Sequence, residues 1–163
     1  MKARKILFYI FASIALAINA LIIVESCIGG EGSATQSISF SETVASWIEN
    51  MFPKANIDHA ALHSALRKLI GHFLLFGGSG LFTTLAIFIN DYLRKRFKRK
   101  NIFFTLGFGL LIAVVSELIQ YFVPGRYGTL LDILIDYSGY ILFSGIAYLF
   151  IYLFLIKKEK KAI

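Results

Sequence analysis

Four long apolar stretches constrain this chain more than any other feature. They cover residues 6–24, 69–90, 102–123 and 131–156, in a chain whose residues are 57% hydrophobic. A helix needs about 20 mainly apolar residues to cross the hydrocarbon core of a bilayer. An ordinary soluble domain is less apolar than this. The sequence therefore predicts an all-α, four-span transmembrane helical bundle that forms a single membrane domain over residues 1–163.

The first apolar stretch has two interpretations. The basic start MKARK and the small residues around Ala15 and Ala17 are typical of a secretory signal peptide. The apolar run, however, continues through Val24, beyond the short hydrophobic region of such a peptide. We therefore expect an uncleaved span, with a cleaved signal peptide as the alternative.

The positive charge is gathered in three places. Most of the 17 Lys and Arg residues lie in residues 2–5, in RKRFKRK at 94–100, and in residues 157–161. In a four-span chain these three places share one side of the membrane, and the positive-inside rule makes that side cytoplasmic. The same residues attract anionic inner-leaflet lipid. We therefore predict a multi-pass protein with cytoplasmic N- and C-termini, and no nucleic-acid partner despite the net charge of +7.

Residues 25–67 form the predicted outer loop. Its Gly- and Ser-rich start, ESCIGGEGSATQS, predicts irregular structure. Apolar residues at helical spacing from Ser41 to Phe52 predict a short amphipathic helix on the outer membrane surface, capped by Ser41 and ended by Pro53. A further helix is expected from about Asp58, merging into the second span. The single cysteine, Cys27, excludes a disulfide within the chain.

Polar side chains recur at the predicted outer ends of three spans. Residues three or four apart share a helix face, and such pairs occur in each of these spans. Since an unpaired charge at this depth is costly, we expect these groups to face inward, with the two cations pairing with the three carboxylates. The predicted ligand-binding residues are Lys68, His72, Glu117, Gln120, Arg126, Asp132 and Asp136.

The mixed charge of this cluster favours the binding of an anionic ligand. Arginine offers a fork of donors that suits phosphate. Lys68 and Arg126 would therefore meet the head group of a membrane lipid or of a lipid-linked cell-wall precursor, and the sequence predicts a pocket that faces outward.

Two other functions remain open. A membrane enzyme would use His72 as a general base, with Glu117, Asp132 and Asp136 as further catalytic candidates or as oxygen ligands of Mg²⁺. The chain has no nucleophile elbow, HExxH motif or typical zinc spacing, so we predict no resident metal or cofactor and do not prefer an enzyme. A structural role, in which the ion pairs fix helix packing within a membrane complex, is the second alternative.

The same polar residues carry a family resemblance. RKLIGHF at 67–73 and ELIQYFVPGRYGTLLDILIDYSG at 117–139 resemble the motifs of the VanZ-like family of small bacterial membrane proteins, and the resemblance covers about residues 33–150. Asp136 departs from the family pattern, which usually has Asn there, and Leu75-Phe76 stands where Glu-Tyr is frequent. The resemblance implies a role in the bacterial cell envelope and in teicoplanin resistance. A glycopeptide antibiotic seated in the lipid is therefore a second candidate ligand.

Overall fold

The fold is entirely helical over the residues that the computed structural model describes, which are 2–53, 57–93, 98 and 100–153. The elements, in chain order, are α1 (Lys2–Cys27), α2 (Gly30–Met51), α3 (His59–Arg67), the π-helical segment η1 (Lys68–Leu74), α4 (Leu75–Leu93), α5 (Lys100–Phe122) and α6 (Leu130–Ile151). Four segments are long and apolar enough to span a membrane: Lys5–Cys27, His59–Asp91, Lys100–Phe122 and Leu130–Ile151. The predicted all-α fold with four candidate spans is confirmed.

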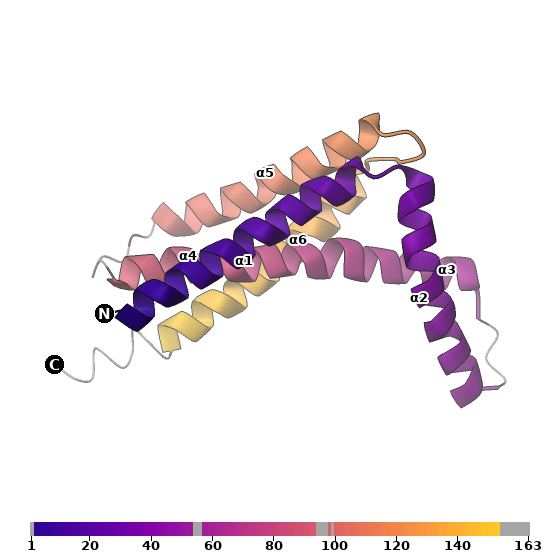
Figure 1. The fold of residues 1–163 in the computed structure, drawn as a ribbon, viewed down its shortest axis with the longest axis horizontal. Coiled ribbons are helices and arrows are strands. Elements are labelled where there is room, and N and C mark those ends of the chain that lie inside the picture. The colour runs from indigo at the N-terminus through magenta and orange to yellow at the C-terminus, as the bar shows by residue number, and fades with distance from the viewer. Residues whose placement is uncertain (1, 54–56, 94–97, 99, 154–163) are drawn as a thin grey trace.

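The four apolar helices run side by side, as Figure 1 shows. α4 lies between α1 and α6 and packs on both, while α5 contacts α6, α4 and α1. Ile22, Phe76, Ala113 and Tyr140 form the buried apolar core. Many large apolar side chains, such as Phe103 at 76% exposure, point outward. An apolar exterior of this extent is typical of a protein surrounded by lipid.

Glycine lets the helix backbones approach closely at two levels. A Cβ atom at Gly80 of α4 would overlap the backbone carbonyl of Tyr140 in α6. A Cβ atom at Gly139 of α6 would overlap the carbonyl of Phe73 in η1. Small residues at helix contacts are the usual device for close packing in membranes, where water does not drive apolar association. These two glycines therefore set how closely α6 lies against η1 and α4.

α2 differs from the prediction for the outer loop. The Gly- and Ser-rich stretch was expected to be irregular, but α2 begins at Gly30 and is 22 residues long. The N–H of Gly30 donates to the carbonyl of Pro124 at 3.2 Å, which anchors the first turn, and extending a helix is easier than starting one. The cap predicted at Ser41 is wrong, because Ser41 lies inside α2 and its hydroxyl donates to the carbonyl of Ile38.

α2 leaves the end of α1 at a steep angle and lies at one end of the bundle, where α3 also begins (Figure 1). Asp58 caps α3 by accepting the N–H of Ala61 at 3.0 Å. The ring of His59 bridges two carboxylates of α2, with 3.1 Å to Glu42 and 3.1 Å to Glu49. α3 then continues without a break through η1 into α4, which confirms the predicted merging of this helix with the second span.

The start of α1 and the end of α6 lie at the opposite end of the bundle from α2 and α3 (Figure 1). Residues 154–156 of the predicted fourth span lie outside the described residues, and so do residues 94–97, 99 and 157–161 of the two basic segments. Cys27 ends α1 and is exposed, with a free thiol. The sidedness of the termini and the uncleaved first span stay predictions.

The close approach at Gly80 predicts a specific loss of stability. Gly80→Ala would force apart α4 and α6, and overpacking of this kind costs about 1–3 kcal/mol. Gly145→Ala in α6 is the control, because no atom lies within 4 Å of its added Cβ and alanine favours helix. Thermal unfolding in detergent, followed by circular dichroism, should show a lower midpoint for Gly80→Ala only. Equal midpoints for the two variants would contradict this account of the packing.

Candidate functional site

Two polar contacts join η1 to α6 at consecutive turns. Lys68 Nζ lies 2.7 Å from Asp132 Oδ1, and His72 Nδ1 lies 3.0 Å from Asp136 Oδ1. His72 lies four residues after Lys68, and Asp136 lies four residues after Asp132. Because the two segments run parallel, this equal spacing lets both pairs form. The expected pairing of Lys68 with a carboxylate is thus present in the structure, and the bond of His72 to Asp136 adds a second contact one turn deeper.

The π-helical form of η1 is a feature that the sequence did not reveal. A π-helix is wider than an α-helix, is rare, and is often found at functional sites. It covers Lys68 and His72, the two residues of η1 that make polar side-chain contacts with α6. The close approach of the Phe73 carbonyl to Gly139 lies in the same segment. The unusual backbone therefore falls where polar side chains from η1 meet α6.

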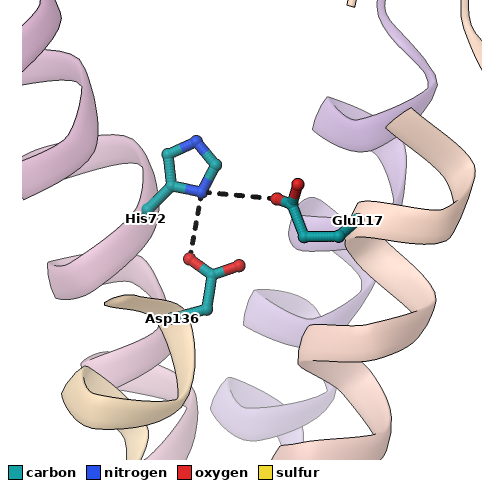
Figure 2. Close-up of side chains that lie close together, drawn as sticks. All are labelled: His72, Glu117 and Asp136. Carbon is teal, nitrogen blue, oxygen red and sulfur yellow. Dashed lines mark hydrogen bonds and ion pairs between the residues drawn. The ribbon is translucent and has the colours of Figure 1, made fainter. Parts of the chain in front are cut away.

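Glu117 lies on α5 and faces the same space. The exposed fraction of Glu117 is 2%, and its carboxylate accepts the side-chain N–H of Gln120 at 3.0 Å and the backbone N–H of Thr129 at 3.0 Å. Its Oε1 also lies 3.7 Å from His72 Nδ1. His72 thus stands between carboxylates of two different helices, as Figure 2 shows. His72, Glu117 and Asp136 are the described residues whose ligand atoms lie close enough to hold a metal ion.

Arg126 was expected to pair with a carboxylate, but it does not. Its guanidinium donates to Gln120 Oε1 at 2.5 Å and to the backbone carbonyl of Glu25 at 3.4 Å. Burial lowers the pKa of Arg126 below its ordinary value, and the neighbouring Arg67 acts in the same direction. An arginine stays charged under such a shift. The result is a half-buried cation whose hydrogen bonds in the described part of the chain go to neutral oxygens.

Thr129 ties two of the carboxylates together and was missing from the predicted site. It caps α6: its hydroxyl accepts the N–H of Asp132 at 3.0 Å and donates to Asp132 Oδ2 at 2.8 Å. Its own N–H binds Glu117. Gly128 permits this arrangement, because a Cβ there would overlap the carbonyl of Glu117. The Thr-x-x-Asp spacing is a capping signal that the sequence does contain.

Two cavities open beside this network. The larger, about 410 Å³, is lined by apolar residues of α1, α2, η1 and α4 and by a polar end that includes Ser26 and Ser116, whose hydroxyls are hydrogen-bonded to each other. The smaller, about 200 Å³, is lined mainly by polar and charged residues, Lys68 and Asp132 among them. Both cavities share four lining residues: Arg67, His72, Gln120 and Arg126.

The structure brings the seven predicted residues into one region at the end of the bundle (Figure 1). Their contacts run from Asp136 through His72 to Glu117, Gln120 and Arg126, with Lys68 and Asp132 beside them. Arg67 was missed. Its signal was present in the Arg-Lys pair that begins RKLIGHF, but helical spacing alone placed only Lys68 on the face of His72.

The capping role of Thr129 predicts a modest and recoverable loss of stability. Thr129→Ala removes both hydroxyl contacts to Asp132, and loss of a helix cap costs about 1 kcal/mol. Thr129→Ser keeps a hydroxyl and should restore most of it, while both variants retain the backbone bond to Glu117. Thermal unfolding in detergent measures the difference. If Thr129→Ala and Thr129→Ser unfolded at the same temperature as the original chain, the cap would contribute nothing.

A known protein family matches this chain over most of its length. The VanZ/LLP1 family model matches residues 7–152, which includes all seven predicted residues and every candidate span in large part. No curated protein and no solved structure shows significant similarity to the chain. A match over most of the sequence shows the family, and the chain belongs to the VanZ/LLP1 family.

Proposed function

We propose that this VanZ/LLP1-family membrane protein binds the anionic head group of a cell-envelope lipid in the two joined cavities. The observation that carries the proposal is that Arg67 and Arg126 line both cavities and that, among the described residues, neither forms an ion pair with a carboxylate. Three carboxylates act on Arg126 only from beyond ion-pair distance, and a partly buried cation without a direct ion pair favours an anionic ligand. Paired forks of donors suit a phosphate in particular.

The shape of the larger cavity supports a lipid rather than a free anion. Its apolar lining includes Ile22, Ile70 and Phe76, and its polar end carries the two arginines and Gln120. A lipid phosphate would meet the polar end while the first part of its chain follows the apolar wall. A volume of about 410 Å³ is in the range of small-molecule sites, which favours a head group over a whole glycopeptide antibiotic. We therefore place the antibiotic second among the candidate ligands.

The predicted sidedness completes the proposal. α1 begins within the basic segment of residues 2–5, and the basic segment of residues 157–161 follows α6 in the sequence, so the positive-inside rule assigns that end of the bundle to the cytoplasm and the cavities to the outer leaflet. A lipid-linked cell-wall precursor exposed there is the favoured ligand. Lower sensitivity to teicoplanin-type antibiotics is the expected cellular consequence in a bacterium.

Native mass spectrometry of the protein purified from its own membrane tests the proposal. The original chain should retain a phosphorus-containing lipid, and Arg126→Ala should weaken its binding roughly 10- to 100-fold, the worth of one charge-assisted hydrogen bond. Arg67→Ala should act in the same direction, and Arg126→Lys should lose less than Arg126→Ala because it keeps the charge.

Lys100→Ala is the matched control, since it removes one exposed positive charge at the opposite end of α5. It should retain the lipid and the teicoplanin sensitivity of the original chain. Unchanged lipid retention in the Arg67→Ala, Arg126→Ala double variant would reject the proposal.

A second candidate function, a lipid-modifying enzyme, is favoured by His72 between Asp136 and Glu117, because a histidine oriented by a carboxylate is a common general base. Incubating the protein with labelled envelope lipid distinguishes the two functions. Under the binding proposal the lipid is recovered unaltered. Turnover that His72→Gln abolishes would replace binding with catalysis.

A further inference from the structure

Three ionisable side chains from separate helical segments converge below the cavities. His72 comes from η1, Glu117 from α5 and Asp136 from α6, and their ligand atoms all lie within 4.8 Å of one another. Figure 2 shows the imidazole pointing between the two carboxylates. One atom, His72 Nδ1, makes both contacts, at 3.0 Å to Asp136 and 3.7 Å to Glu117.

The hydrogen bonds of this cluster leave one oxygen without a partner. Asp136 is fully buried, and its Oδ2 has no hydrogen-bond partner among the described residues. In Figure 2 the oxygen of Asp136 that carries no dashed line is turned toward the helix of Glu117. A buried carboxylate oxygen with no donor is rare and points to something that binds it.

The charges of the cluster point to a cation. Two carboxylates are enclosed together, with Glu117 at 2% and Asp136 at 0% exposure. Lys68, one turn before His72, is engaged with Asp132, and Arg126 with Gln120. A single N–H on His72 Nδ1 serves one carboxylate well and not both. If Nδ1 instead presents its lone pair, three electron-rich atoms face one another, an arrangement that a proton or a bound metal ion between them would stabilise.

We propose that His72, Glu117 and Asp136 bind one divalent metal ion, with Zn²⁺ as the first candidate. Zinc accepts imidazole nitrogen and carboxylate oxygen at about 2.0–2.2 Å in a tetrahedral arrangement, so neighbouring ligand atoms lie about 3.3–3.6 Å apart. The contacts of Nδ1, at 3.0 Å and 3.7 Å, lie close to this range, and the two carboxylates, whose ligand atoms lie within 4.8 Å of each other, would be held together by the ion. Mg²⁺ prefers oxygen alone. This proposal differs from the sequence prediction of no resident metal, and from its Mg²⁺ alternative, in which Asp132 replaced His72.

The surroundings of the cluster resemble the outer shell of a metal site. Gln120 donates to the Glu117 oxygen nearest His72, and the Thr129 N–H binds the other oxygen. Such bonds hold a ligand carboxylate in one orientation. Three protein ligands also leave a fourth position for another ligand. His72 and Gln120 line both cavities, so the ion would lie directly behind the cavity wall.

Metal loading of the full-length protein in detergent tests the site, with Zn²⁺ alone as the probe. After removal of metal with a chelator, we expect one tightly held Zn²⁺ per chain by elemental mass spectrometry. X-ray absorption at the zinc edge should show mixed nitrogen and oxygen ligands. Asp136→Asn, which keeps the shape of the side chain, should weaken Zn²⁺ binding by more than the about 10- to 100-fold typical of losing an outer-shell partner.

Asp132→Asn is the matched control, because it makes the same change one turn earlier on α6 in a residue paired with Lys68. It should retain Zn²⁺, as should Arg126→Ala, so that a failure of the lipid proposal does not affect this one. Absence of zinc binding in the original chain overturns the proposal and leaves a shared proton to explain the cluster. Equal zinc binding by Asp132→Asn and Asp136→Asn overturns it as well. The X-ray absorption spectrum of the original chain tests the ligand set even if a variant fails to fold.

Discussion

The burial of three carboxylates in an apolar bundle is the constraint on which the rest of this structure depends. Glu117, Asp132 and Asp136 each expose less than a tenth of their surface, in segments whose other faces are apolar. A bilayer offers no water to such groups, so the protein itself has to supply most of their partners. The bonds from Lys68 and His72 to α6, and from Thr129 to Glu117, supply these partners. They also fix the register of η1, α5 and α6 at one end of the bundle.

This register requires unusual local structure. Lys68 and His72 reach α6 at consecutive turns only because η1 runs parallel and close to it, and the close approach is possible because residue 139 is glycine. The backbone of η1 takes the wider π-helical form over the same seven residues. The polar contacts and the irregular backbone therefore occur in the same segment. Departures from regular helix geometry of this kind are expected at functional sites.

The sequence predicted the spans and the gathering of polar residues well, because both follow from simple physical rules. Apolar length determines a span, and the cost of a charge in lipid turns Glu117, Asp132 and Asp136 inward. Spacing rules assume a regular α-helix, so they did not predict η1. The first turn of α2 is anchored by the long-range bond from Gly30 to Pro124. A bond between residues so far apart in the sequence cannot be predicted from local composition. The predicted carboxylate partner of Arg126 was also wrong, since the guanidinium instead donates to the side-chain amide of Gln120 and to the backbone carbonyl of Glu25.

Most of the positive charge of the site lines the cavities, and two carboxylates lie behind them in a buried layer. Arg67 and Arg126 line both cavities, and they outweigh the carboxylate of Glu25 in the larger cavity and the Lys68–Asp132 ion pair in the smaller one. Glu117 and Asp136 line neither cavity. The cavity layer therefore favours an anion and the buried layer favours a cation or a proton. His72 belongs to both layers, because it lines both cavities and contacts both carboxylates. Occupancy of one layer changes the charge that the other layer feels, so an anion in the cavities and a cation behind them would stabilise each other across this single imidazole.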